Sequence, residues 1–228
     1  MRREKKFTFQ QEYLSNVRKR IHDSKYLFRK TYDDRYVNSI YLDSFDFANY
    51  NENLSGLSQR SKARIRWYSE KTFRQLSEND DVSFEIKTRN NLFGEKLVYK
   101  LNFPIEVLRM NASEIFYFLR DSLPNEYLPH MDHCNVFSLG VAYKREYYED
   151  FSKEIRATID RNLSFRRLNN SLPLNFKSVE CIKLEYGILE LKYPQKIPDI
   201  MREIHFDGNE ITPGRHSKYT IGVNLIES

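Results

Sequence analysis

Residues 62–67, Lys-Ala-Arg-Ile-Arg-Trp, place a cation on every second position and an apolar side chain in between. Because side chains on a β-strand alternate between its two faces, this stretch puts its charges on one face and its apolar residues on the other. Three more stretches share the alternation: Glu85-x-Lys87-x-Arg89, Arg156-x-Thr158-x-Asp160 and Glu190-x-Lys192. If these rows of charge converge, they form a binding site for a polyanion.

The composition is typical of a folded, soluble protein, since 40% of the 228 residues are hydrophobic and 30% are charged. This length fits one large domain or two small ones, and because no boundary is obvious we expect a single domain over residues 1–228. No apolar run approaches the roughly 20 residues that cross a bilayer, and no signal-peptide stretch is visible, so we expect a cytoplasmic protein without a direct membrane span. The two cysteines, Cys134 and Cys181, have no CxxC spacing and favour a reducing compartment.

The net charge of +5 alone barely favours a nucleic-acid partner. Its distribution along the chain is more informative. Together with the companion residues Glu4, Lys6, Arg145 and Lys218, the alternating stretches hold enough cations to contain the whole basic excess. The cations of this set are Lys6, Lys62, Arg64, Arg66, Lys87, Arg89, Arg145, Arg156, Lys192 and Lys218.

The order of patterned segments predicts an α+β fold that is mainly antiparallel β. Consecutive strands with little helix between them favour a sandwich or a barrel. We expect strands at 4–8, 37–43, 62–68, 82–89, 95–103, 136–148, 154–165, 181–186 and 188–193. Helices are expected at 10–22, 46–53, within 105–123 and at 198–204, and a loop over 212–219.

A charged face on an antiparallel strand most often faces solvent, and periodicity alone favours that interpretation. Three details oppose it. Lys62, Arg64 and Arg66 stand in line and repel one another unless an anion lies between them. Trp67, on the apolar side, suits burial under a helix. Glu85 and Glu190 each open an E-x-K step, so carboxylates recur beside cations, as a site for metal and phosphate requires.

Taken in order, these segments resemble the catalytic domain of the vacuolar transporter chaperone (VTC) family, a branch of the triphosphate tunnel metalloenzymes. The resemblance spans Glu4 to Tyr219, and the closing Ser-Lys-Tyr favours this branch over the adenylate cyclase and thiamine triphosphatase relatives. Its pieces are Glu4-x-Lys6, Lys62-x-Arg64-x-Arg66, Glu85-x-Lys87-x-Arg89, Tyr143-x-Arg145, Arg156-x-Thr158-x-Asp160, Glu190-x-Lys192 and Ser217-Lys218-Tyr219.

The resemblance implies a closed, eight-stranded antiparallel tunnel barrel with helices packed outside. It also implies a phosphotransferase that binds the triphosphate of ATP and passes the terminal phosphoryl group to a growing polyphosphate chain, with Mn²⁺ or Mg²⁺ as cofactor. A hydrolase of tripolyphosphate or nucleoside triphosphates, and a non-catalytic binding module for polyphosphate or nucleotide, stay open as alternatives. No membrane helix is expected, so synthesis would either be coupled to translocation through a separate membrane partner or not be coupled to it at all.

The arginine fork binds two phosphate oxygens at once, whereas lysine acts as a point charge. By family position Glu190 is the best metal ligand, with Glu4 and Glu85 as secondary candidates that could instead orient neighbouring cations. Asp160 is expected to pair with Arg156 or another cation, and the Tyr143 hydroxyl could donate to phosphate or pack in the wall. The predicted triphosphate or polyphosphate ligands are Lys6, Lys62, Arg64, Arg66, Lys87, Arg89, Arg145, Arg156, Lys192, Ser217 and Lys218, and the catalytic set is Arg64, Arg66, Glu190 and Lys192.

Other chemistries are poorly represented. The sequence contains no GxxxxGK[ST], GxGxxG or HExxH motif. His130, His133 and Cys134 have no second half of a zinc site, so a loop with a buried cysteine is favoured. RNA binding is not expected, because Trp67 lies on the apolar face and no RRM-type aromatic pair is visible.

Overall fold

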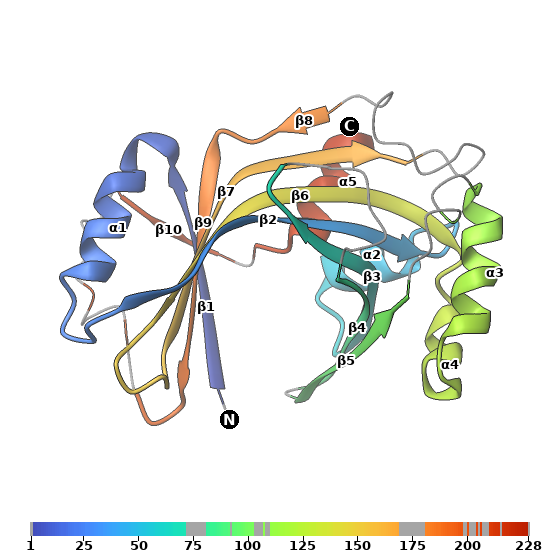
Figure 1. Ribbon diagram of the computed structural model, residues 1–228, viewed down its shortest axis with the longest axis horizontal. Helices are drawn as coiled ribbons and strands as arrows, with labels where there is room; N and C mark the ends of the chain where they lie inside the picture. The colour runs from blue at the N-terminus through green and yellow to red at the C-terminus, as the bar shows by residue number, and fades with distance from the viewer. Residues whose placement is uncertain are drawn as a thin grey trace. The chain divides into compact units, whose positions relative to one another are not determined.

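The computed structural model of the chain describes most of its residues (Figure 1). The described residues are 2–71, 81–91, 93–102, 107, 110–168, 181–197, 200, 204, 206, 210–214 and 216–227. The expected helix at 198–204 falls mainly outside them, as does the end of the strand expected at 95–103.

The fold is α+β, with a mainly antiparallel sheet and five α-helices among the described residues. The strands are β1 (Arg2–Gln10), β2 (Arg29–Asp43), β3 (Gln59–Ser69), β4 (Val82–Asn90), β5 (Phe93–Leu101), β6 (Val136–Glu149), β7 (Arg156–Arg167), β8 (Cys181–Lys183), β9 (Tyr186–Pro194) and β10 (Thr212–Pro213). The helices are α1 (Leu14–His22), α2 (Ala48–Ser55), α3 (Ala112–Ser122), α4 (Leu128–Met131) and α5 (Lys218–Glu227), with 3-10 turns at Gln11–Tyr13 and Asn125–Tyr127.

The sheet has ten strands in the order β10-β1-β9-β7-β6-β2-β3-β4-β5, with β8 paired to β7. Among the described residues, no backbone pairing joins β5 to β10. The hydrogen bonds therefore do not close the sheet, and the closed eight-stranded barrel is not confirmed. The two-residue strand β10 forms one edge, and its Pro213 has no N–H to donate to a further strand.

The chain divides into two compact units. Unit 1 comprises residues 1–36, 143–163 and 183–217, and unit 2 comprises residues 37–142, 164–182 and 218–228. Strands β2, β6 and β7 contribute residues to both. The single domain over residues 1–228 stays a prediction.

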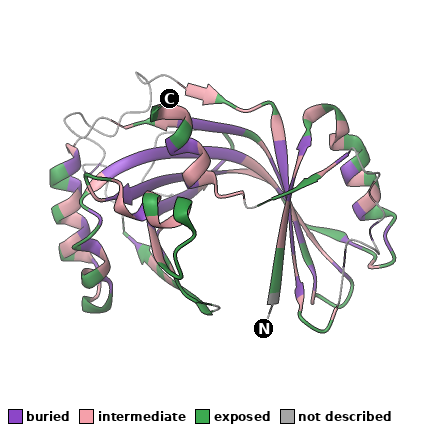
Figure 2. Ribbon diagram, turned by 180° about the vertical axis from the view of Figure 1, so that it is seen from behind, coloured by how far each residue is buried: buried purple, intermediate pink, exposed green. Residues whose placement is uncertain are grey.

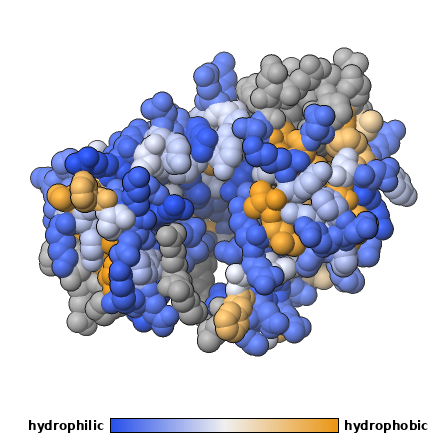
Figure 3. Space-filling model, turned by 60° about the horizontal axis from the view of Figure 1, so that its bottom comes forward, coloured by the Kyte–Doolittle hydropathy of each residue, from blue (hydrophilic) through white to orange (hydrophobic). Residues whose placement is uncertain are grey.

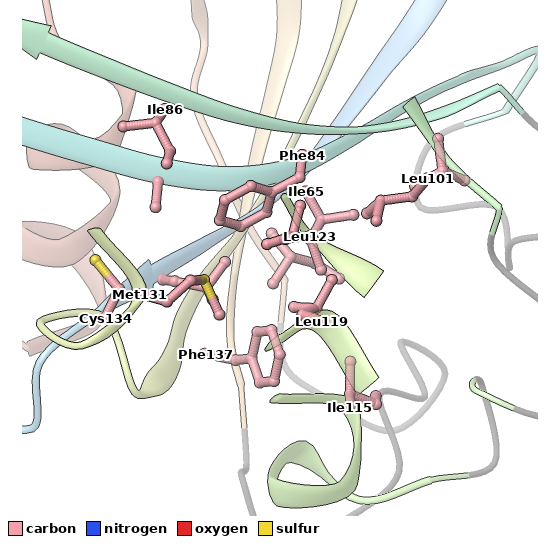
Figure 4. Packing of buried hydrophobic residues seen from close by; sticks show 14 of the residues in the cluster. Ile65, Phe84, Ile86, Leu101, Ile115, Leu119, Leu123, Met131, Cys134 and Phe137 are labelled. Atoms are coloured by element: carbon pink, nitrogen blue, oxygen red, sulfur yellow. The ribbon is translucent and has the colours of Figure 1, made fainter. Parts of the chain in front are cut away.

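Each unit has its own hydrophobic core. In unit 1, Val17 and Ile21 of α1 pack with apolar residues of β1, β7 and β9, among them Ile159 and Leu189. In unit 2, apolar residues of β3 and β4 pack with α3 and the segment around Met131 (Figure 4). Buried stretches follow the strands, whereas α1 and α3 mix buried with exposed residues (Figure 2). The apolar faces predicted from alternation thus form the two cores.

Most expected elements are present. The first strand, the helix after it, the hairpin of β4 and β5 and the helix at 112–122 are confirmed. The hairpin register pairs Asn90 with Phe93, and Asn91 takes the left-handed conformation (φ 55°) that tight hairpin turns require. Asn111 and Glu114 form a reciprocal capping box at the start of α3. Strand β2 begins at Arg29, eight residues earlier than expected, because its exposed polar start carries no apolar alternation.

The prediction of a loop over residues 212–219 is wrong in two places. Thr212 and Pro213 pair with Thr8 and Phe7 of β1, and Lys218 begins helix α5. Gly222 and β-branched residues lower the helix propensity of residues 218–227. Packing outweighs this propensity, since α5 buries Tyr219, Gly222 and Val223.

Replacing Gly222 by alanine is expected to destabilise the protein. A Cβ at this position would lie 2.4 Å from Phe165 Cδ1 and 2.5 Å from Leu139 Cδ2. Overpacking costs about 1–3 kcal/mol, which exceeds the gain of about 1 kcal/mol in helix propensity. Urea unfolding measures the difference. The matched control is Gly94→Ala, whose Cβ would meet only Thr88 O at 3.5 Å, and equal stability of both variants would contradict the packing argument.

Candidate functional site

In unit 1, strands β1 and β9 bring four predicted site residues together. Their antiparallel register places Glu4 opposite Lys192 and Lys6 opposite Glu190. Lys6 Nζ lies 2.8 Å from Glu4 Oε1 and 3.4 Å from Glu190 Oε2, while Lys192 Nζ lies 2.6 Å from Glu190 Oε1 and 3.8 Å from Glu4 Oε2. We call these four residues the β1–β9 charge cluster.

The β1–β9 charge cluster keeps Lys6 charged. Burial alone would lower the pKa of this amine, but the carboxylates of Glu190 and Glu4 outweigh burial and raise the pKa above its ordinary value. The cluster therefore presents fixed cations beside two carboxylates, as the sequence pattern predicts.

Arg145 and Asp160 form a buried bidentate pair in the same unit. The guanidinium donates from Nε to Oδ1 (2.5 Å) and from Nη2 to Oδ2 (2.7 Å), and Asp160 is fully buried. Burial would lower the pKa of Arg145, yet Asp160, Tyr143 and Glu190 raise it well above its ordinary value. Asp160 was expected to pair with Arg156 or with another cation, and in the structure it pairs with Arg145.

Arg156 is half-exposed and pairs with Glu149 at 2.7 Å. In the register of β7 with β9, Arg156 lies opposite Lys192 and Thr158 lies opposite Glu190. The Thr158 hydroxyl is buried and finds no hydrogen-bond partner among the residues that the structure describes. The uncharged Thr158 hydroxyl therefore lies opposite Glu190, where its oxygen could serve as a ligand for a metal ion.

In unit 2, Glu85 contacts three cations. Arg64 donates to its Oε2 from Nε (2.8 Å) and Nη2 (2.6 Å), Lys96 Nζ lies 2.8 Å from Oε1, and Arg66 Nη1 lies 3.7 Å from Oε2. Burial raises the pKa of Glu85, but Arg64, Arg66 and Lys96 outweigh it and bring the pKa to about 2. Glu85 therefore orients cations, which is one of the two roles that the sequence left open for it.

A row of lysines crosses three adjacent strands of unit 2. Lys62 of β3 lies opposite Lys87 of β4, and Lys87 lies opposite Lys96 of β5. Like charges directly opposite one another destabilise a sheet. Lys96 also pairs with Glu85, and a polyanion lying along the row would add a negative partner shared by all three lysines, in keeping with the predicted ligand.

Lys96 and Tyr41 were not among the predicted site residues, and Thr158 was placed in a charged row without a role of its own. Lys96 follows the same period of two as the earlier rows, which was the available signal. The Tyr41 hydroxyl accepts a hydrogen bond from Arg64 Nη1 at 2.9 Å. Burial raises the pKa of Tyr41, but Arg64, Arg66 and Lys62 outweigh it and lower the pKa to about 8.

The three residues of the closing Ser217-Lys218-Tyr219 motif lie in different environments. Tyr219 is buried, stacks on Tyr41 with 4.9 Å between ring centroids, and donates to Asp43 Oδ2. Asp43 also accepts from the backbone N–H groups of Asn49 and Tyr50 at the start of α2. Tyr219 is therefore a structural residue, whereas Ser217 and Lys218 are partly exposed.

Arg89 and Lys87 lie near the end of the β4–β5 hairpin and are exposed. Arg89 Nε donates to the backbone carbonyl of Asn91 at 3.0 Å.

Cys134 is buried, as the sequence predicts, and its sulfur accepts a hydrogen bond from Asn49 Nδ2 at 3.2 Å. Burial raises the pKa of the Cys134 thiol to about 12.

The residues of the β1–β9 charge cluster fit a divalent cation that also binds phosphate. Mg²⁺ and Mn²⁺ prefer oxygen ligands and are usually held by one or two carboxylates together with substrate phosphates. Glu190 and Glu4 supply the carboxylates, and Thr158 supplies a hydroxyl that no other group in the described ranges engages. In the part of the chain that the structure describes, no group of three or more His, Cys, Asp or Glu side chains forms an all-protein metal cage.

Hydrophilic side chains cover most of the face shown in Figure 3. No helix in the described ranges has the length and apolar character needed to span a bilayer.

Comparison with known proteins identifies the family. The model of the VTC domain matches residues 1–123 and 136–227, which is nearly the whole chain. No curated protein matches the sequence. The match includes every strand that carries the charged rows, and the chain belongs to the VTC domain family.

Proposed function

We propose that this protein is a polyphosphate polymerase that transfers the terminal phosphoryl group of ATP to a growing inorganic polyphosphate chain. The VTC domain family is associated with polyphosphate synthesis. The observation that carries the proposal is the placement of the alternating cations, above all the opposed lysines Lys62, Lys87 and Lys96. Closure of the sheet into a tunnel is part of the proposal.

Phosphoryl transfer needs little covalent help from a protein. An oxygen of the terminal phosphate of the polyphosphate chain forms a bond to the γ-phosphorus of ATP. The bond from that phosphorus to the β,γ-bridging oxygen breaks, and ADP leaves with the electron pair. Positioning and neutralisation of charge on the phosphate oxygens supply most of the acceleration.

The chain's own residues suit this work. Arg64, Arg66 and Arg145 are held by carboxylates or hydroxyls, so their guanidinium groups are oriented before a ligand binds. Oriented arginines bind phosphate oxygens in pairs. Glu190, with Glu4, would hold Mn²⁺ or Mg²⁺, which when bound neutralises charge on the phosphate oxygens.

One assay tests the proposal directly. The pure protein is incubated with ATP and Mn²⁺, and chain length, free phosphate and ADP are followed. Chain growth together with ADP supports the polymerase. Release of phosphate without chains would replace it with the hydrolase, and tight binding without turnover would replace it with a binding module.

Replacing Arg64 by alanine is expected to weaken binding of ATP and of polyphosphate. A charge-assisted hydrogen bond contributes about 1.5–3 kcal/mol, which corresponds to roughly 10- to 150-fold in affinity. Isothermal titration calorimetry measures the change. Arg120→Ala is the matched control in the same unit, since Arg120 lies on α3, outside the charged rows, and forms an ion pair with Asp132. Unchanged affinity in Arg64→Ala would remove Arg64 from the proposed phosphate-binding residues.

A further inference from the structure

Two tyrosines and an arginine of unit 1 form a stack that the proposed reaction does not use. The rings of Tyr32 on β2 and Tyr147 on β6 meet edge to face, with 5.5 Å between centroids. Arg35 Cζ lies 5.5 Å from the Tyr32 centroid and 5.2 Å from the Tyr147 centroid, and its Nε donates to the Tyr147 hydroxyl at 3.4 Å. We call these three residues the Tyr32–Tyr147 stack.

The stack continues into a predicted phosphate-binding residue. Arg145 Cζ lies 6.0 Å from the Tyr147 centroid and 5.1 Å from the Tyr143 centroid. The bidentate bond to Asp160 fixes the guanidinium of Arg145 in this position. Aromatic rings and guanidinium groups therefore alternate along a series that runs from the buried Tyr143 through Arg145, Tyr147 and Arg35 to Tyr32.

Exposure increases along this series. Tyr143 is 2% exposed, Arg145, Arg35 and Tyr147 are partly buried, and Tyr32 is 59% exposed. The outer ring thus stays accessible to a ligand. A stack that is half open to water hides little apolar area, so core packing does not account for it.

Nucleic acid bases stack on tyrosine rings and on arginine guanidinium planes, and the same contacts are available to the base of a free nucleotide. We propose that the Tyr32–Tyr147 stack is a nucleobase subsite: the base of the nucleotide donor stacks on Tyr32 while its phosphates extend toward Arg145. This inference rests on the proposed function, because it names the part of the donor that the phosphate-binding cations do not contact.

The test compares two ligands that differ in whether they carry a base. ATP has a triphosphate and a purine, whereas tripolyphosphate has only the phosphates. Tyr32→Ala is expected to weaken ATP binding roughly 5- to 150-fold, since base stacking contributes about 1–3 kcal/mol. Tripolyphosphate affinity is expected to stay unchanged. Calorimetric titration of both ligands in the same buffer gives the two values.

Two further variants separate stacking from other effects. Tyr32→Phe retains the ring and is expected to keep wild-type ATP affinity. Phe151→Ala is the matched control, since Phe151 is 71% exposed and lies under another arginine, Arg29, at 5.6 Å, without the link to Arg145. It should change neither affinity.

The outcomes distinguish this inference from the proposed function. Equal weakening of ATP and tripolyphosphate by Tyr32→Ala, or no change in either, would overturn the base subsite while leaving phosphate binding established. Loss of ATP affinity in Tyr32→Phe would also overturn it, because the hydroxyl would then be the contact. A wild-type protein that binds neither ligand would refute the proposed function, and the subsite with it.

Discussion

Glu190→Gln is expected to abolish metal-dependent chain growth while ATP binding stays measurable. The amide is nearly isosteric with the carboxylate but carries no charge, so it holds a divalent cation weakly. Neutralisation of the phosphate oxygens by a metal ion contributes several kcal/mol to the transition state, so we expect at least a 100-fold loss in rate. The rate of chain growth across a Mn²⁺ titration measures this loss.

The structure also explains why this variant should still bind ATP. Glu190 forms ion pairs with Lys6 and Lys192, and removing the charge of Glu190 leaves both lysines in place to bind phosphate. Titration of ATP in the presence of a chelator reports binding without the metal. Glu185→Gln serves as the control, because Glu185 is exposed and precedes β9. Full activity in Glu190→Gln would remove this carboxylate from the mechanism.

Glu146→Ala is expected to cost about 3–5 kcal/mol of unfolding free energy. Glu146 is buried and accepts from Arg18 Nε (3.0 Å) and Nη2 (2.6 Å), from Arg161 Nε (2.8 Å) and from the Tyr148 hydroxyl (2.8 Å). These bonds join α1 to β6 and β7 within unit 1. Its removal leaves two guanidinium groups without their shared carboxylate, a large loss for a protein of typical stability.

Chemical denaturation at several pH values tests this role. Burial raises the pKa of Glu146, but hydrogen bonds from Arg18, Tyr148 and Arg161 outweigh it and lower the pKa. The stabilisation is therefore present above the ordinary glutamate pKa and is lost as pH falls through the lowered value. The difference in unfolding free energy between the wild type and Glu146→Ala should therefore become smaller at acidic pH.

Glu154→Ala is the control for this experiment. Glu154 is partly exposed and pairs with the exposed Lys196 at 2.7 Å, and such surface pairs contribute at most about 1 kcal/mol. A Glu146→Ala variant as stable as Glu154→Ala would show that α1 is held by its apolar contacts alone.

Alternation along the chain was sufficient to predict what lies on each strand face. Residues 62–67 form part of β3 with Ala63, Ile65 and Trp67 buried, and the rows of β1 and β9 meet as charged pairs. A period of two is a local property of the backbone, so the sequence contains it in full. On β1, β3 and β9 the charged side chains therefore lie on the faces that alternation predicts, whereas Lys218 lies at the start of helix α5.

Partners across strands could not be predicted in the same way. The pairing of Asp160 with Arg145, and of Glu85 with Lys96, depends on which strands are neighbours and on their register. Register follows from the pairing of whole strands and from turn geometry rather than from any single stretch. Helix α5 was missed for a related reason, since contacts of Gly222 with Phe165 and Leu139 come from strands distant in sequence.

The opposed lysines of β3, β4 and β5 imply a conflict between stability and function. Like charges directly opposite one another lower the stability of a sheet, so substitutions that remove the charge of Lys62 or Lys87 are expected to stabilise the ligand-free protein, whereas Lys96 also pairs with Glu85. The same substitutions would weaken its hold on polyanions. Selection for thermal resistance alone would therefore be expected to erode this row first.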